Sequence, residues 1–124
     1  MKNKEFNLLE WHDATLKCIN IDRSNPGYND SIEIDIVWPS GGENKLIFKD
    51  VYSANFSLNF GVIAEESILG ASIIDNSNVE IIKIKEKWSK LYDGIKDLYG
   101  FEIKTASTAS NIKIFALSFS LENV

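Results

Sequence analysis

YSANFSLNF, at residues 52–60, alternates apolar and polar side chains at every position. Successive side chains of a β-strand point to opposite faces of the sheet, so the pattern predicts a strand with one apolar and one uncharged polar face. The aromatic residues favour a strand, and the unbroken alternation does not fit the period of a helix. We expect this segment to be an inner strand of an antiparallel sheet. The side chains expected to face the core are Tyr52, Ala54, Phe56, Leu58 and Phe60.

Other alternating segments predict further strands on both sides of this stretch. We expect them at residues 11–22, 31–38, 45–51, 101–104 and 111–121. Residues 67–75 are ambiguous between extended chain and loop.

Three irregularities stand out in these strands. The first strand breaks its alternation between Leu16 and Ile19, which predicts a β-bulge near Cys18. The third and fourth strands follow each other with almost no connection, so we expect a bend near Asp50. The last strand changes the parity of its apolar residues, so it either contains a bulge or is covered on both faces.

One segment has the pattern of an amphipathic helix. Apolar residues recur at helical spacing along residues 81–98, with lysines on the opposite side. Ser77 and Glu80 have the spacing of a capping box, in which each side chain satisfies a free amide of the other. Because glycine disfavours a helix interior, we expect Gly94 to end or break the helix.

These elements predict an α+β fold in a single domain over residues 1–124. Its sheet is mostly antiparallel, about six strands in size and strongly curved or partly closed, and one main helix packs on its apolar face. We expect the helix to cover the apolar side chains of residues 31–38, 45–51 and 52–60. The opposite face of the sheet carries carboxylates, amides and hydroxyls.

Charge and composition narrow the possible partners. The chain has 124 residues, a net charge of −5 and a pI near 4.8. An acidic surface repels nucleic-acid phosphates, so no nucleic-acid partner is expected. The same charge attracts a basic protein, although it also serves solubility.

The sequence contains no feature of a secreted or membrane protein. Cys18 is the only cysteine, so neither an internal disulfide nor a cysteine-cluster zinc site can form. Residues 1–10 lack the apolar run of a signal peptide, and no stretch approaches the roughly 20 apolar residues that span a bilayer. We therefore expect a cytoplasmic protein that does not bind membranes.

We expect no catalytic residue, metal site or cofactor. His12 is the only histidine, and hence the only side chain whose ordinary pKa lies near neutrality. Asp13 follows it directly, but adjacent strand residues point to opposite faces, so the two are not expected to act as a dyad. The acids show no spacing typical of a metal site. We interpret His12 as structural and the protein as a non-enzyme.

Several blocks of sequence together resemble a known group of proteins. They are WHDA at residues 11–14, IDRSNPGYND at 21–30, Trp-Pro at 38–39, NFGVIAEESI at 59–68 and FEIKTASTASNIKIFALSFSL at 101–121. They resemble small bacterial immunity proteins of polymorphic toxin and contact-dependent growth-inhibition systems. No block is a catalytic motif, and no subfamily is assigned.

The resemblance implies a function of binding rather than catalysis. The protein would neutralise a cognate toxin domain, such as a nuclease, by stoichiometric association, as a monomer or a weak homodimer. An acidic surface suits a basic nuclease cleft. The residues that we expect to contact the toxin are Asp22, Asp30, Glu33, Asp35, Glu65 and Glu66.

Two other hypotheses remain open at this stage. The chain could be a small-molecule-binding module or weak hydrolase that uses the mouth of the curved sheet, with His12 and carboxylates converging in a pocket. It could also be a subunit of a homo-oligomer in which the strand at residues 111–121 pairs with its copy.

Overall fold

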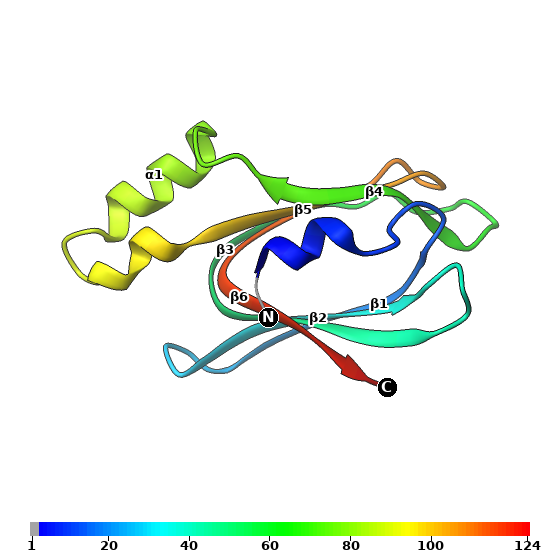
Figure 1. Ribbon diagram of the computed structural model, residues 1–124, viewed down its shortest axis with the longest axis horizontal. Helices are drawn as coiled ribbons and strands as arrows, with labels where there is room; N and C mark the ends of the chain where they lie inside the picture. Colours follow the sequence, from blue (N-terminus) through cyan, green and yellow to red (C-terminus); the bar gives the residue numbers. More distant parts are fainter. Residues whose placement is uncertain (1–2) are drawn as a thin grey trace.

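Six antiparallel strands close into a barrel in the order β1-β2-β3-β6-β5-β4 (Figure 1). The computed structural model describes residues 3–124. The strands are β1 (Thr15–Asn25), β2 (Asn29–Val37), β3 (Glu43–Ser57), β4 (Glu66–Ile74), β5 (Tyr99–Thr105) and β6 (Asn111–Asn123). With one main helix, α1 (Val79–Trp88), this arrangement confirms the predicted α+β fold with a curved antiparallel sheet.

The strand that closes the barrel is β4, the segment whose sequence was ambiguous. β4 pairs with β1 through Thr15↔Ser67 and Leu16↔Glu66. Just before β1, Ile68 donates its backbone N–H to the carbonyl of Ala14 at 2.7 Å. Closure pairs the start of β1 with the start of β4, which protects that part of the two outer edges of the sheet.

The core lies inside the barrel and follows the predicted alternation. Ile32, Ile34 and Ile36 of β2 are buried, and so are Leu46 and Phe48 of β3. Inward-facing residues of β5 and β6 complete the same cluster. The predicted bulge near Cys18 is confirmed, because the register of β1 against β2 shifts between Leu16 and Cys18.

The N-terminal segment is part of the core. The sequence predicts a lead-in at residues 1–9 with Phe6, Leu8 and Leu9 against the body; this is confirmed for Phe6 and Leu9 and wrong for Leu8, which is exposed. Residues 1 and 2 lie outside the described part of the chain. The 3-10 helix η1 (Asn3–Leu8) lies across the ring of strands (Figure 1). It buries Phe6 completely, and the ring of Phe6 lies 4.7 Å from that of Trp11 and 5.0 Å from that of Phe101 between centroids.

The stretch at residues 52–60 does not form a separate inner strand. It continues β3, and the predicted bend is confirmed at Asp50, whose φ is 55°. The register against β6 also shifts between Val51 and Ser53, so parity changes within the strand. Tyr52 therefore packs in a cluster outside the barrel, whereas Phe56 packs against the core inside it.

The end of this stretch corrects the prediction further. β3 ends at Ser57, and Leu58 and Phe60 lie in the following loop. Phe60 is 82% exposed and Leu58 is 40% exposed. Apolar alternation predicted the strand correctly as far as Ser57. It placed the end of the strand three residues too late and overestimated the burial of Leu58 and Phe60.

Helix α1 packs on the outside of the barrel. Ile81 joins Ile74, Ile95, Leu98 and Phe115 in a second apolar cluster. The sequence pattern had placed the helix over the apolar residues of β2 and β3, but barrel closure already buries those residues. β6 is thus covered on both faces, which is the second explanation for its change of parity.

The ends of the helix differ from the predicted ones. Asn78, not Ser77, is the N-cap, and its Oδ1 accepts the N–H of Glu80 at 2.8 Å. Ser77 instead donates its hydroxyl to Asp75. The helix ends at Trp88, before Gly94, which lies in the short 3-10 helix η2 (Asp93–Asp97).

The edges of β6 leave little room for pairing with a second copy. One edge pairs with β3 along the strand, and the other pairs with β5 from Asn111 to Ala116. Beyond this, Asn3 bonds the carbonyl of Leu117 and the N–H of Phe119. Pairing with a second copy through residues 111–116 would displace β3 or β5, and the hypothesis of a homo-oligomer through residues 111–121 stays a prediction.

Candidate functional site

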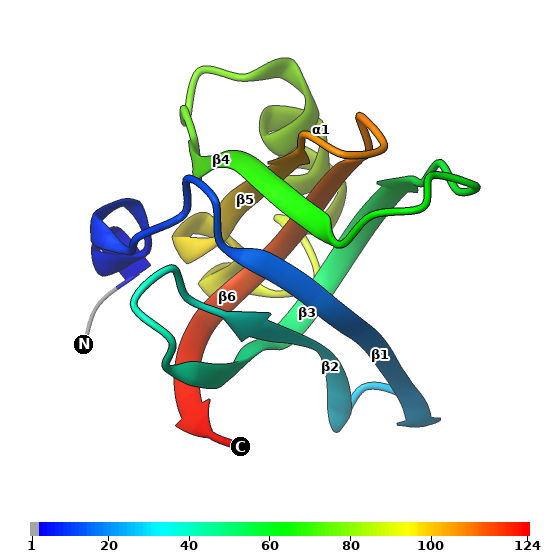
Figure 2. The same cartoon turned by 90° about the vertical axis from the view of Figure 1, so that its right-hand side faces the viewer.

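A cleft of 580 Å³ opens where β2 separates from β3. The two strands pair from Val37↔Glu43 to Ser31↔Lys49 and then diverge. Figure 2 shows the tip of the β1–β2 hairpin pointing away from the far end of β3. Trp88 from outside the barrel and Ile32 from its core both line the cleft, so the cleft passes through the gap between the strands.

Three carboxylates and one guanidinium line this cleft. They are Asp22 and Arg23 of β1, Asp30 of β2 and Asp50 of β3. Asp22 and Asp30 were predicted contact residues, and the fold brings them together. Asp50 was predicted only as a bend, and no sequence signal placed it beside the other two acids.

Hydrogen bonds of the turn hold two of these carboxylates in place. Asp22 Oδ1 accepts the backbone N–H of Ser24 at 2.9 Å and its hydroxyl at 2.7 Å, and Asp22 Oδ2 accepts from Asn29 Nδ2 at 2.9 Å. The backbone bond to Ser24 contributes most to lowering the pKa of Asp22 below its ordinary value. Asp30 Oδ2 accepts the N–H of Gly27 at 3.0 Å. Gly27 has φ 84°, a conformation that glycine adopts without strain.

Aromatic rings form the wall of the cleft on the helix side. Tyr52 contacts Trp88 edge to face, with ring centroids 5.2 Å apart, and stacks on Tyr92 at 6.2 Å. Burial is the main cause that raises the pKa of Tyr52, and the nearby Tyr92, Asp50 and Asp30 raise it further. The wall therefore combines apolar area with a negative potential. The sequence pattern had placed Trp88 in the helix stripe and gave no sign of this second role.

Glu33 and Asp35 lie elsewhere, on the outer face of β2. Both are half-buried and approach Lys45 of β3, whose Nζ lies 3.3 Å from Glu33 Oε1 and 3.4 Å from Asp35 Oδ1. These two partners, Glu33 first, raise the pKa of Lys45. The two acids thus share one cation, and they do not line the cleft.

Glu65 and Glu66 lie at a second cleft or beside it. Glu66 lines a hollow of 260 Å³ between β1 and the loop after β3, where its carboxylate accepts from the N–H and the hydroxyl of Thr108. Glu65 lies 3.8 Å from Lys17 across an exposed ion pair. The six predicted contact residues are therefore in three separate places, and only Asp22 and Asp30 share a concave surface.

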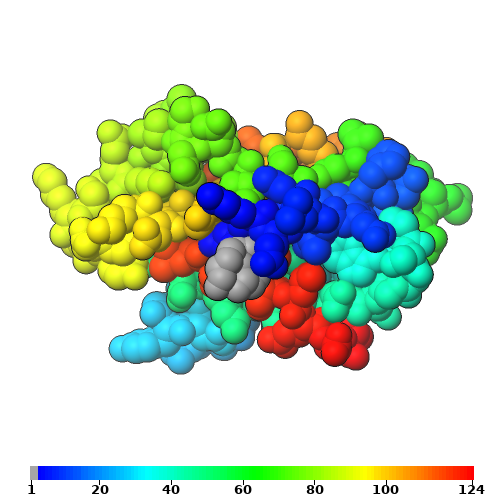
Figure 3. Space-filling model, in the orientation of Figure 1, coloured from blue at the N-terminus to red at the C-terminus, as the bar shows by residue number. Residues whose placement is uncertain are grey.

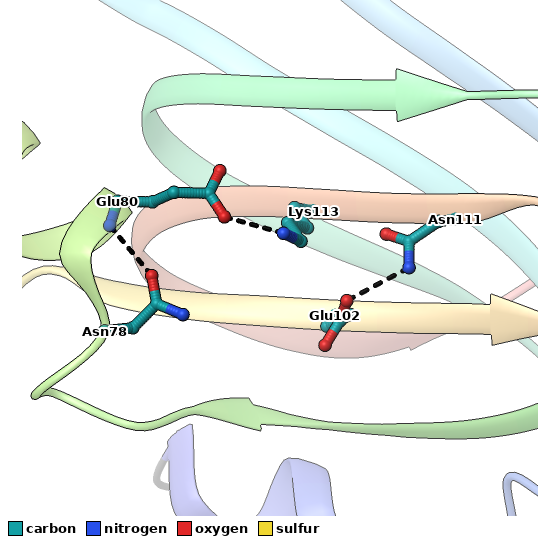
Figure 4. Close-up of polar contacts among 5 residues, drawn as sticks. All are labelled: Asn78, Glu80, Glu102, Asn111 and Lys113. Atoms are coloured by element: carbon teal, nitrogen blue, oxygen red, sulfur yellow. Dashed lines mark hydrogen bonds and ion pairs between the residues drawn. The ribbon is translucent and has the colours of Figure 1, made fainter.

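The outer face near α1 carries a further set of polar contacts (Figure 4). Lys113 of β6 bonds Glu80 of the helix at 2.6 Å, and Asn111 donates to Glu102 at 3.0 Å. The Glu80–Lys113 pair attaches the helix to the barrel, and the Asn111–Glu102 bond joins β6 to β5. We assign them a structural role.

His12 lies outside both clefts. It is exposed, with Nδ1 3.2 Å from the carbonyl oxygen of Leu69 and Nε2 3.7 Å from Asp13 Oδ2. The expectation that adjacency would separate His12 from Asp13 is wrong, because Asp13 has φ 68° and neither residue is in a strand. The hydrolase hypothesis requires a pocket in which His12 and carboxylates converge. His12 lines neither of the two clefts.

Residues 3–124 contain neither a metal-ligand cluster nor a membrane-spanning helix. Among these residues, no three histidine, cysteine or acidic side chains are grouped so that they could hold a metal ion. None of the helices described there has the length and apolar character needed to cross a bilayer.

Comparison with known proteins identifies no relative of this chain. The chain matches no model of a protein family, and no curated protein is significantly similar to it.

Proposed function

We propose that this protein is an immunity protein that binds a bacterial toxin domain stoichiometrically and blocks it, with the cleft between β2 and β3 as the docking surface. The observation that carries the proposal is the set of three carboxylates, Asp22, Asp30 and Asp50, on the rim of a 580 Å³ cleft with an aromatic wall. The resemblance to immunity proteins supplies the class of partner.

Charge supports a basic partner. The chain has a net charge of −5, and the cleft concentrates three carboxylates against the single cation of Arg23. Complementary charge steers two proteins together and raises the association rate. A nuclease domain presents the basic surface that such a cleft attracts, because it must bind phosphates.

The aromatic wall of the cleft supports a protein as the partner. Tyrosine and tryptophan are enriched at the centres of protein interfaces, where they bury large areas with few rotatable bonds. Tyr52 and Trp88 are half-buried in the cleft and held against each other. Because Asp22 and Asp30 are also fixed by hydrogen bonds, binding would order few side chains.

The decisive experiment is binding to the toxin domain encoded beside the gene. Purified wild-type protein should bind that domain in a 1:1 complex by calorimetry, and its co-expression should restore growth of cells that make the toxin. The double variant Asp30→Asn/Asp50→Asn should weaken binding by about tenfold or more, mainly through a slower association rate. Asn suits position 50, because it tolerates positive φ.

A matched control is the double variant Glu43→Gln/Glu86→Gln, which likewise removes two carboxylates, both exposed and lining neither cleft. It should bind as the wild type does. Equal loss of affinity in both variants would show a general effect of net charge. Absence of both binding and growth protection would refute the proposed function.

A second candidate function is small-molecule binding in the same cleft. Its volume of 580 Å³ lies within the range of roughly 300–1,000 Å³ that is common for ligand sites. A thermal-shift screen with small organic cations separates the two functions. A stabilising ligand that the Asp30→Asn/Asp50→Asn variant no longer binds would favour the small molecule.

A further inference from the structure

One edge of β3 has no partner along the cleft. From Asp50 to Ser57 the strand pairs with β6 on one side only, because its pairing with β2 ends at Ser31↔Lys49. Within residues 3–124, no strand lies on the other edge, and no backbone hydrogen bond outside the strands reaches residues 50–57. Figure 2 shows this half of β3 continuing past the point where β2 turns away.

An edge of this kind can accept another strand. Its unpaired N–H and C=O groups form a row to which an extended chain can bond, and many peptide-binding domains use such strand addition. Here the free edge lies in the wall of the 580 Å³ cleft, since Val51, Ser53 and Phe56 all line it. The cleft therefore provides both the hydrogen-bonding edge and the space for an added strand.

The lining of the cleft indicates the chemistry of that strand. Asp30 and Asp50 lie where β2 and β3 diverge, and Asp22 lies on the neighbouring strand β1, paired with Ser31. Ile32 and Phe56 provide apolar surface from the barrel side. The cleft therefore offers both carboxylates and apolar surface to the side chains of an added strand.

We propose that the cleft binds an extended segment of a basic protein partner, containing both Lys or Arg and apolar residues, as an added strand on the free edge of β3. This inference rests on the proposed function, because it specifies how the toxin domain engages the cleft. At 3.3 Å per residue, the edge accommodates a segment of about six residues.

The test uses a defined peptide and does not depend on the toxin. The blocked hexapeptide KVRVKV should bind the intact protein in calorimetry, and its charge-reversed counterpart EVEVEV should bind at least about tenfold more weakly. In NMR hydrogen exchange, amides within residues 51–57 should exchange more slowly when KVRVKV is bound. Amides of α1 should not change.

N-methylation separates strand addition from simple charge attraction. Two N-methylated versions of KVRVKV keep its charge. Each version lacks the backbone N–H groups along one of the two edges of the extended peptide. One of them should lose at least about tenfold in affinity, because it cannot bond β3, while the other should retain binding. Equal affinities of the two would overturn the inference.

The remaining outcomes are also decisive. If Asp30→Asn/Asp50→Asn binds KVRVKV as tightly as the wild type, the carboxylates do not select the strand and the inference fails. A dimer in light scattering that protects residues 51–57 would assign the edge to a second copy of the chain and overturn the inference. Binding of the toxin domain without protection of residues 51–57 would overturn strand addition and leave the proposed function standing.

Discussion

Lys113 of β6 and Glu80 of α1 form an ion pair, with Nζ 2.6 Å from Oε1 (Figure 4). The pair connects the main helix to the outer face of the barrel, next to the apolar cluster that contains Ile81 and Phe115. Figure 3 shows the helical region, in yellow and yellow-green, as a lobe at one end of the molecule, above the light-blue tip of the β1–β2 hairpin. The position of this lobe fixes Trp88, and with it one wall of the cleft.

Removal of this ion pair should destabilise the fold modestly. Both side chains are partly exposed, so we expect Glu80→Gln to lower the free energy of unfolding by about 0.5–1 kcal/mol in urea denaturation. High salt should reduce the difference. A double-mutant cycle with Lys113→Met isolates the pair, and a coupling energy of zero would contradict its role.

The same pair should give stability a dependence on alkaline pH. The hydrogen bond to Glu80 is the main cause that raises the pKa of Lys113 above its ordinary value. Its contribution is therefore complete below the unfolded pKa of about 10.4 and is lost as pH rises through the higher folded pKa. Lys113→Met should remove this component from the fall in stability above pH 10, as measured by urea denaturation at several pH values.

The N-terminal cap of α1 provides a second prediction. Asn78→Ala should lower the free energy of unfolding by about 1 kcal/mol, because the amide of Glu80 loses its acceptor. Asn78→Asp should retain most of the stability. The matched control is Ser77→Ala, which we expect to change stability by less than about 0.5 kcal/mol. A larger loss of stability in Ser77→Ala than in Asn78→Ala would indicate that Ser77 is the N-cap, as the sequence predicts.

The N-terminal segment should contribute strongly to stability. Phe6 is fully buried among the rings of Trp11, Phe48, Phe101 and Phe119. Phe6→Ala should cost about 3–5 kcal/mol, because it leaves a cavity in the core. Leu8→Ala in the same segment, at a side chain 80% exposed, is the control and should leave the thermal midpoint nearly unchanged.

Asp22, on the rim of the cleft, should have a pKa below its ordinary value. The backbone N–H of Ser24, then its hydroxyl, lowers the pKa of Asp22. The stability from these bonds is present above the unfolded pKa of about 3.9 and is lost as pH falls through the lower folded pKa. In an NMR titration of the side-chain carboxyl carbon, Asp22 should have its midpoint below 3.9. Ser24→Ala should raise that midpoint, and an unchanged midpoint would contradict the turn geometry.

Local sequence patterns were sufficient to predict the structure where buried and exposed positions alternate regularly along a strand. The alternation of Ile32, Ile34 and Ile36 placed β2 on the core correctly, because a strand with one buried face needs that period. The break between Leu16 and Ile19 located a bulge for the same reason. The short connection at Asp50 located the bend of β3.

Other features depend on contacts between distant segments. Ser77 and Asn78 are both good caps, and only the path of the chain after β4 decides between them. Asp22 and Asp30 come together with Asp50 because β2 leaves β3 after Ser31. No spacing in the sequence encodes that separation.

The sequence by itself determined five of the six strands, the main helix, the acidic charge and the absence of a second cysteine, because these follow from local periodicity and composition. Only the tertiary structure decided that the sheet closes on itself, that α1 packs outside it, and that one edge of β3 remains free in an acidic cleft. The physical reason is that closure depends on the pairing of β1 with β4 and on the burial of Phe6. These contacts join residues far apart in the chain, and local propensity does not specify them.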